Sequence, residues 1–200
     1  MRRSDRDVRV CFVGDSFVAG LGDGSALGWV GRVVAASAAR GLPLTAYNLG
    51  VRRDTSEQVA ERLAREVAPR LAPAAEPRVV VSFGVNDTAL GDDARPRVDL
   101  AGSRAALRRI AADLGPVPLL LVGPVAVDDD DHNARSAELD AALRDEASAL
   151  GVPYVPVLDR TARDATWRHE VRAGDGAHPG AAGYAVLAGL VEEQVLAWIG

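Results

Sequence analysis

Short apolar runs alternate along the chain with longer segments whose apolar residues recur at helical spacing. Short runs that are rich in valine and bounded by turn residues are typical of buried strands. Such runs cover residues 8–13, 44–49, 78–83, 117–122 and 152–157.

The segments between these runs predict helices. The clearest covers residues 55–71, where Val59, Leu63 and Val67 recur at every fourth position and form one apolar stripe. Before it, Asp54 and Glu57 resemble a capping box at the start of the helix. Further helices are expected over residues 100–114, 135–150 and about 179–199.

The alternation of strand and helix predicts a parallel sheet with helices on both faces, because right-handed crossovers join parallel strands over the sheet. Pro153 and Pro156 place the fifth strand at an edge, since proline cannot donate to a central ladder. The strand order 2-1-3-4-5 meets this constraint. We expect one domain over residues 1–200, with residues 1–7 as an N-terminal arm.

Composition narrows the classes of partner and chemistry. The chain has 200 residues and a net charge of -5. Because nucleic-acid binding requires a basic face, we do not expect a nucleic acid as a partner. All 23 positively charged residues are arginine, which excludes Schiff-base chemistry and a P-loop lysine. The single cysteine, Cys11, lies inside the first strand, so we expect a buried thiol. No cysteine and histidine residues have zinc spacing, and we expect neither a metal nor an organic cofactor.

The apolar segments do not suggest a membrane protein. No stretch reaches the length of a transmembrane span. The charged start leads directly into the first strand, without the apolar core of a secretory signal. We expect a cytoplasmic protein without integral membrane association, and the sequence leaves its oligomeric state open.

Four short polar motifs follow predicted strands one, two, three and five. Because the carboxyl ends of parallel strands meet at one edge of a sheet, residues in these motifs come together there. Each motif alone is typical of an ordinary turn or helix start. They are Gly14-Asp15-Ser16, Asn48-Leu49-Gly50, Gly84-Val85-Asn86-Asp87 and Asp175-Gly176-Ala177-His178-Pro179.

Together, the four motifs contain the groups that a serine hydrolase needs. A serine hydroxyl needs a base to remove its proton, and the base needs a carboxylate to orient it. Ser16 is the candidate nucleophile, and His178 has Asp175 close enough to fix its tautomer. An oxyanion needs preorganised donors, and the Ser16 N–H, the Gly50 N–H and the Asn86 amide converge on one point if the strands adjoin as predicted.

This ordered set resembles the SGNH/GDSL hydrolase family, and the resemblance extends from about residue 8 to residue 199. It implies a flavodoxin-like three-layer α/β/α fold with a five-stranded parallel sheet. It also implies the roles of the matching residues: Ser16 as nucleophile and oxyanion donor, Gly50 and Asn86 as oxyanion donors, His178 as base and Asp175 as its orienting carboxylate.

Two positions depart from the family pattern. Phe17 stands where the motif usually has leucine, and we expect it in the core. Arg53 stands where many relatives have a second glycine, so the pattern does not specify the backbone path there. Arg52 or Arg53 at the rim of the site favours a substrate with an anionic group, whereas a solvated arginine near Asp54 is the alternative.

Other polar residues have simpler interpretations. Residues 128–131 are four consecutive aspartates, for which a solvated acidic loop is favoured over a calcium site. His132 and His169 have no partner in sequence, and we expect ordinary surface or loop residues. Trp167 either lines the pocket or packs in the core.

We expect a ping-pong hydrolase that cleaves a small-molecule acyl ester through an acyl-enzyme on Ser16. A chain of 200 residues has little material for a lid, so we expect an open cleft and short acyl chains or small acetylated substrates. A thioesterase, a lysophospholipase, a sugar O-acetylesterase or an acyltransferase could use the same triad, and a catalytically silent acyl-binding protein could share the fold. An α/β-hydrolase is disfavoured because no Gly-x-Ser-x-Gly elbow occurs, and a phosphoacceptor receiver because the chain has no lysine.

Overall fold

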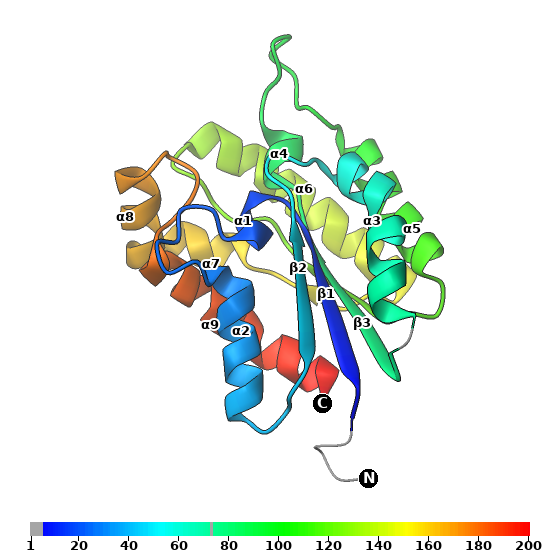
Figure 1. Cartoon of the computed structure of the whole chain (residues 1–200). Helices are drawn as coiled ribbons and strands as arrows, with labels where there is room; N and C mark the ends of the chain where they lie inside the picture. Colours follow the sequence, from blue (N-terminus) through cyan, green and yellow to red (C-terminus); the bar gives the residue numbers. More distant parts are fainter. Residues whose placement is uncertain (1–5, 73) are drawn as a thin grey trace.

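The computed structural model describes residues 6–72 and 74–200, so residues 1–5 of the predicted N-terminal arm lie outside the described residues. Strands and helices alternate along the chain, as predicted (Figure 1). The strands are β1 (Val8–Gly14), β2 (Thr45–Gly50), β3 (Glu76–Ser82), β4 (Leu119–Val122) and β5 (Tyr154–Val155). The helices are α1 (Ser16–Ala19), α2 (Gly28–Ala39), α3 (Ser56–Leu71), α4 (Val85–Thr88), α5 (Leu100–Leu114), α6 (Asp130–Leu150), α7 (Leu158–Arg163), α8 (Ala165–Ala173) and α9 (Ala181–Ile199).

The five strands form one parallel sheet in the predicted order, β2-β1-β3-β4-β5. β1 lies between β2 and β3, with Gly14 opposite both Gly50 and Ser82. β5 is an edge strand of two residues between Pro153 and Pro156. The two prolines therefore mark the edge as expected, and they also make β5 shorter than the apolar run that predicted it.

Side chains alternate along the strands and divide the core between the two faces of the sheet. Val10 and Phe12 face the cluster under α1, α2, α8 and α9, whereas Cys11 and Val13 face the cluster under α3, α5 and α6. Figure 1 shows α2 and α9 on one side of the sheet and α3 and α5 on the other. Because helices cover both faces, the strands carry continuous apolar runs rather than alternating ones.

α3 begins one residue later than the sequence predicts. Thr55 is its N-cap, and the capping box joins Thr55 to Gln58 rather than Asp54 to Glu57. The carboxylate of Asp54 is not available as a cap, because it accepts a hydrogen bond of 2.6 Å from Arg62 Nε.

α6 begins at Asp130, several residues before the predicted start near residue 135. Asp129 caps it by accepting the His132 N–H at 2.8 Å. The acidic run that was expected to be a loop is therefore largely the cap and first turn of a helix. Carboxylates there are stabilised by the positive end of the helix dipole.

α9 is long and apolar enough to cross a membrane by length and composition alone, with a mean hydropathy of 1.2. The prediction that no stretch reaches this length was therefore wrong. Tyr184, Leu187 and Val191 of this helix are buried in the core, where α9 packs against α2 and α8. The apolar character of α9 thus has a structural explanation, as a helix buried between others.

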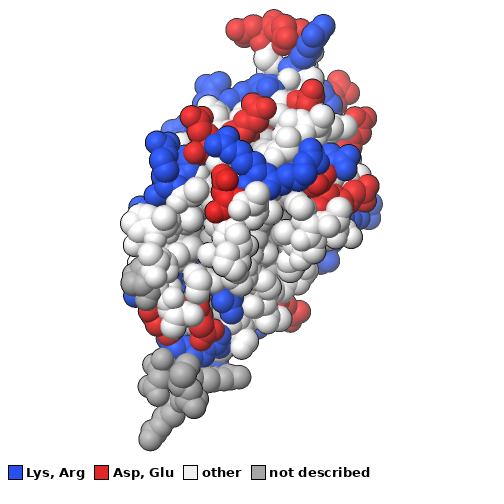
Figure 2. All heavy atoms as spheres, turned by 90° about the vertical axis from the view of Figure 1, so that its right-hand side faces the viewer, with Lys and Arg blue, Asp and Glu red and all other residues white. Residues whose placement is uncertain are grey.

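The face formed by α3 and α5 carries charges of both signs. Figure 2 shows arginine and acidic side chains interspersed over its upper part, with a largely uncharged surface below. Some of them pair within a helix, as Arg62 does with Glu66 and Arg109 with Asp113.

Gly14 ends β1 at a point of very close packing. A Cβ at this position would collide with the carbonyl oxygen of Ser82 and lie 2.6 Å from Val18 Cγ2. Only glycine allows β3 and α1 to approach β1 this closely, so Gly14 determines where Ser16 leaves the sheet.

Gly14→Ala should lower the free energy of unfolding by about 3 kcal/mol or more, because a collision with a backbone oxygen cannot be relieved by a rotamer change. Gly24→Ala is the matched control, since no atom of the described residues lies within 4 Å of a Cβ at that position. The control should change stability by less than about 1 kcal/mol. Urea denaturation followed by circular dichroism measures both variants, and equal stability of the two would contradict the packing argument.

Candidate active site

Ser16 lies at the carboxyl edge of the sheet, where α1 begins immediately after β1. Asp15 caps this short helix by accepting the Phe17 N–H at 2.9 Å, and Gly20 ends it with a left-handed φ of 79°. The Ser16 side chain is thereby turned toward the loop between α8 and α9, which carries Asp175 and His178.

A continuous hydrogen-bonded chain joins Ser16, His178 and Asp175. Ser16 Oγ lies 2.8 Å from His178 Nε2, and His178 Nδ1 lies 2.8 Å from Asp175 Oδ2. An imidazole with its proton on Nδ1 donates to the carboxylate and leaves Nε2 to accept from the serine. This arrangement can remove the proton of the Ser16 hydroxyl.

Asp175 is held as a charged group by its own loop. Its Oδ1 accepts the backbone N–H groups of Ala177 at 3.0 Å and His178 at 2.8 Å. Burial raises the pKa of Asp175, but the hydrogen bonds from these N–H groups and from the His178 imidazole lower it by more. The resulting pKa is about 2, below the usual value. The carboxylate therefore stays ionised at neutral pH, as is needed to stabilise an imidazolium beside it.

A column of aromatic rings supports the histidine. The Phe17 ring lies 4.8 Å from the His178 ring, 6.4 Å from Trp167 and nearly parallel to Trp167, which in turn meets Tyr184 edge-on. The Tyr184 hydroxyl donates to Leu21 O at 2.8 Å. Phe17 is buried, as predicted, and its position beneath the imidazole restricts the orientation of the ring.

The backbone of Gly50 approaches α1 closely. A Cβ at this position would collide with the Ala19 backbone nitrogen and lie 2.8 Å from Asp15 O. The Gly50 N–H, expected as an oxyanion donor, donates to Asn48 Oδ1 at 3.0 Å. The Gly50 N–H can donate to an oxyanion only if it is shared between Asn48 Oδ1 and the oxyanion or leaves Asn48 Oδ1 for it.

The side-chain amide of Asn86 also has internal acceptors. Its Nδ2 donates to Asp54 O at 3.0 Å and, over a longer 3.3 Å, to Asp15 Oδ2. The longer bond is the weaker one, so this N–H is the more readily redirected toward a ligand. The Ser16 N–H, at the first position of α1, has no partner inside its helix.

Ser16 opens into a cavity of about 330 Å³, which we call the serine cavity. Asn86, Arg52 and Arg53 line it together with the Asp175–His178 loop, whereas Gly50 is not among its lining residues. Arg52 and Arg53 are both among its lining residues, whereas a role for either in binding substrate stays a prediction.

Arg53 has the left-handed backbone conformation, with a φ of 68°. The chain therefore follows at Arg53 the path that a glycine would favour, at a cost of about 1–2 kcal/mol for a residue with a Cβ. Arg97, from the loop between α4 and α5 that projects at this end of the sheet (Figure 1), donates to Arg53 O at 3.1 Å. Asp54 binds Arg62 rather than either rim arginine.

His132 is a residue of this site that the sequence did not predict. It lines the serine cavity, and its Nε2 lies 2.9 Å from Val85 O and 3.0 Å from Thr88 Oγ1. Burial lowers its pKa. The ring ties α6 to α4, the short helix that carries Asn86. The helix cap at Asp129 was the signal that could have placed His132 on a helix and not in a loop.

Two buried carboxyl groups lie beneath the cavity. Asp87 accepts the Ser56 N–H at 2.7 Å and the Ser103 hydroxyl at 2.6 Å, and burial raises its pKa. Burial also raises the pKa of Asp15, to about 7. The hydrogen bond from the Phe17 N–H lowers this pKa, whereas the negative charges of Asp87 and Asp54 raise it. Asp15 is thus a buried acid that titrates near neutrality beside the Asn86 amide.

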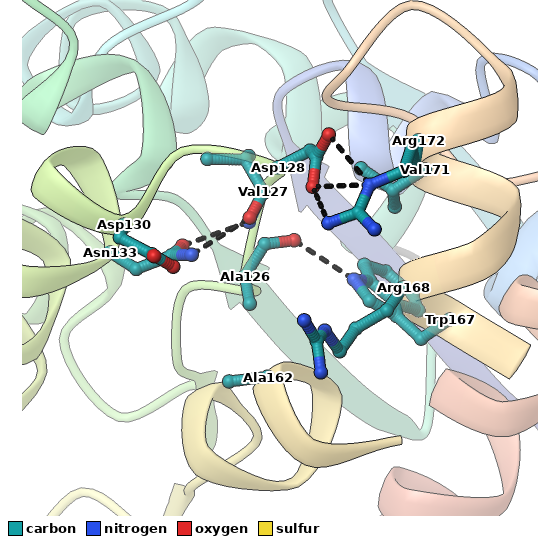
Figure 3. Close-up of a pocket in the computed structure, with 10 residues that line it drawn as sticks. All are labelled: Ala126, Val127, Asp128, Asp130, Asn133, Ala162, Trp167, Arg168, Val171 and Arg172. Atoms are coloured by element: carbon teal, nitrogen blue, oxygen red, sulfur yellow. Dashed lines mark hydrogen bonds and ion pairs between the residues drawn. The ribbon is translucent and has the colours of Figure 1, made fainter. Parts of the chain in front are cut away.

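A second hollow, of about 550 Å³, adjoins the serine cavity at Val127 (Figure 3). The Asn133 side chain binds both the N–H and the carbonyl of Val127. Trp167 is 1% exposed and donates from Nε1 to Ala126 O, so it both packs in the core and lines this hollow.

Asp128 connects this hollow to the histidine loop. Figure 3 shows its carboxylate in a bidentate ion pair with Arg172 of α8, in which Arg172 Nη2 lies 2.8 Å from Asp128 Oδ1. Its backbone N–H donates to Gly176 O at 2.9 Å, next to Asp175. The ion pair and the backbone hydrogen bond together fix the two ends of the segment that carries Asp175.

The aspartates at residues 128–131 do not gather around one point. Asp128 pairs with Arg172, and Asp129 caps α6. Within residues 6–72 and 74–200, no group of three or more acidic, histidine or cysteine side chains is arranged to hold a metal ion.

The three-layer fold and the Ser16–His178–Asp175 chain define a serine hydrolase. A model of the GDSL-like Lipase/Acylhydrolase family matches residues 12–186, and the chain belongs to this family. It is thereby an ester-cleaving serine hydrolase, as the sequence predicted. A search of curated proteins found no match.

Solved structures share the fold. A lipase/acylhydrolase from Enterococcus faecalis superposes with a TM-score of 0.78 at 24% identity, over 95% of this chain and 96% of that one. The acetylxylan esterase Axe2 from Geobacillus stearothermophilus has a TM-score of 0.70 at 22% identity, over 96% and 94%. The esterase EstA from Pseudoalteromonas sp. has a TM-score of 0.74 at 14% identity, over 96% and 98%.

Asp175→Asn should lower kcat by about 10⁴-fold, because the amide can donate to Nδ1 and thereby favours the tautomer that cannot accept from Ser16. Steady-state hydrolysis of p-nitrophenyl acetate measures this loss. Asp159→Asn is the control, since Asp159 is on α7 with its side chain 82% exposed, and it should retain full activity. An Asp175→Asn enzyme within about tenfold of the wild type would contradict the orienting role.

The buried Asp15 should make stability depend on pH. Burial raises its pKa from the ordinary 3.8 to about 7, so its contribution to stability is fully present below pH 3.8 and is lost as the pH rises through about 7. Asp15→Asn cannot ionise, so the unfolding free energy of the wild type minus that of the variant should fall between about pH 4 and pH 8. Urea denaturation across this range measures the difference, with the exposed Asp92→Asn as control. A difference that does not change with pH would refute this assignment.

Proposed function

We propose that this protein hydrolyses small carboxylic esters through an acyl-enzyme on Ser16. The observation that carries the proposal is the unbroken chain from Ser16 Oγ through His178 to Asp175, with both contacts at 2.8 Å. Membership of the GDSL-like family supports an ester as the bond that is cleaved.

In the first half of the reaction, His178 Nε2 takes the proton of Ser16 as Oγ bonds to the acyl carbon. The carbonyl electron pair moves to its oxygen, and the donors to that oxyanion are the Ser16 N–H and the Asn86 amide, joined by the Gly50 N–H when it shares or leaves Asn48 Oδ1. When the tetrahedral intermediate collapses, the C–O bond to the alcohol breaks and His178 gives that oxygen its proton. The acyl group remains on Ser16.

In the second half, His178 takes a proton from water as the water oxygen bonds to the acyl carbon. Collapse breaks the bond to Ser16 Oγ, which recovers its proton from His178. The sum is one ester and one water converted to one acid and one alcohol. Asp175 stays ionised throughout and stabilises the imidazolium that forms twice in the cycle.

The serine cavity supports a small acyl group. Its volume of about 330 Å³ is near the lower end of the range for small-molecule sites. Val85, Ala89 and Val127 supply apolar surface for a short chain. Because one solved structure of this fold is an acetylxylan esterase, acetyl esters are the first substrates to test. A thioester, a lysophospholipid or an acyl acceptor other than water would use the same groups, but no contact specifically favours any of them.

Wild-type protein should hydrolyse p-nitrophenyl acetate, with kcat/KM falling as the acyl chain lengthens to octanoate. Ser16→Ala should lower kcat by about 10⁴- to 10⁶-fold, since it removes the nucleophile. Ser148→Ala, at an exposed position of α6, is the matched serine control and should keep wild-type rates. Absorbance of p-nitrophenolate measures all three proteins.

Two results would contradict the proposal in different ways. Unchanged activity in Ser16→Ala would refute the nucleophile. A folded wild type that is inactive on every ester of the series would favour a specialised acyl acceptor or an acyl-binding protein of the same fold. A preference for octanoate over acetate would refute only the short-chain specificity.

A further inference from the structure

The turn after β2 is held rigidly in a strained conformation. Arg53 keeps its left-handed φ of 68° because Arg97 binds its carbonyl oxygen and the next residue, Asp54, is bound on both sides. Arg62 holds the Asp54 carboxylate at 2.6 Å, and Asn86 donates to the Asp54 carbonyl at 3.0 Å. Strain of this kind persists only where the surroundings enforce it, and it concentrates at functional sites.

The side chains of Arg52 and Arg53 at this turn are left without acceptors. Among the described residues, neither guanidinium donates a hydrogen bond or joins an ion pair, although Arg62 and Arg97 nearby both do. Both arginines are exposed at the surface of the serine cavity. Their charges are therefore available to a ligand.

The acidic side chains near these arginines already have partners. Asp175 is engaged by His178, and Asp129 caps α6. Glu170 accepts the N–H groups of Ala182 and Gly183 at the start of α9. Each of these carboxylates is thus held in place by its own segment, and none of them forms an ion pair with Arg52 or Arg53 in the described part of the chain.

Arg52 also lies at the junction of two hollows. A groove of about 560 Å³, which we call the histidine groove, shares Leu21, Arg52, Asp175 and His178 with the serine cavity. Asn86 does not line this groove, whereas His169 does. The groove therefore extends from the serine on the side of the imidazole and away from the Asn86 amide.

This placement distinguishes the two ends of an ester. His178 must protonate the departing oxygen, so the alcohol portion lies on the side of the imidazole. The oxyanion lies by the Asn86 amide, and the acyl portion occupies the remaining part of the serine cavity. Arg52 is thus beside the path of the alcohol.

We propose that Arg52, with Arg53 next to it, binds an anionic group on the alcohol portion of the substrate. This inference rests on the ester hydrolysis proposed above and specifies its substrate class, an ester whose alcohol carries a carboxylate or a phosphate. A guanidinium offers two parallel N–H donors that match either anion. With a net charge of -5, the protein as a whole repels an anionic substrate, so a local cationic group has a clear use.

Matched pairs of esters test the proposal. The anionic esters are 4-acetoxybenzoate, with a carboxylate on the alcohol portion, and 4-acetoxyphenyl phosphate, with a phosphate there. The neutral reference is 4-acetoxybenzamide. A third anionic ester, p-nitrophenyl hydrogen adipate, has its carboxylate on the acyl portion, and its primary amide is its own neutral reference.

The quantity to compare is kcat/KM for each anionic ester divided by kcat/KM for its neutral reference. Arg52→Gln should lower this ratio on the order of tenfold for the alcohol-side anions. General effects of the substitution on the site divide out of the ratio. Arg163→Gln removes the same charge from α7, where its side chain is 82% exposed, and should leave the ratio at the wild-type value.

Salt supplies an independent readout. Raising the ionic strength from about 0.05 M to about 0.5 M should lower the wild-type ratio for alcohol-side anions and lower that of Arg52→Gln much less. Unequal losses on the carboxylate and phosphate esters will show which anion the site prefers.

The outcomes separate this inference from the proposed function. Hydrolysis of the neutral esters that depends on Ser16, with ratios unaffected by Arg52→Gln, would overturn the anionic site and leave the esterase intact. A selective loss on the adipate ester would overturn the assignment to the alcohol side. Failure to hydrolyse any ester would refute the proposed function itself.

Discussion

One hydrogen bond, between Ser16 Oγ and His178 Nε2, joins residues 162 positions apart and constrains the architecture around it. The serine is positioned by the central strand, β1, and the histidine by the last loop before α9. Gly22 crosses over this loop so closely that a Cβ there would lie 2.6 Å from Pro179 O. Phe17 supports the imidazole from below. A site assembled from distant segments keeps its geometry only when packing fixes each of them.

The sequence predicted the fold because its strongest signals are local and agree with one another. The apolar runs identified the strands, and Pro153 with Pro156 marked the edge that sets their order. The helix starts were less predictable, because a cap depends on which carboxylate is free. Asp54 was expected to cap α3, but Arg62 binds it, and this ion pair joins positions that no sequence pattern relates.

The site was predictable in its four motifs and less so in what surrounds them. Ser16, His178, Asp175 and Asn86 come together at one edge because parallel strands end there. Long-range contacts decided the rest. His132 reaches the site through the helix α6, the buried Asp15 lies near Asp54 and Asp87 from distant segments, and the Gly50 N–H is bound by Asn48. Such contacts depend on distances between elements, which a residue pattern does not contain.

The burial of Cys11 has a consequence for how this molecule is oxidised or alkylated. The only thiol of the chain lies in the middle of β1, fully buried, and burial raises its pKa to about 12. An oxidant or alkylating agent needs an exposed thiolate, so it can react only after β1 has separated from its neighbours. The same separation removes Ser16 from His178, because Ser16 follows β1 by two residues, at the start of α1, and moves with the strand. Chemical damage and loss of the site therefore share one barrier, and the thiol is modified only in molecules whose site has already come apart.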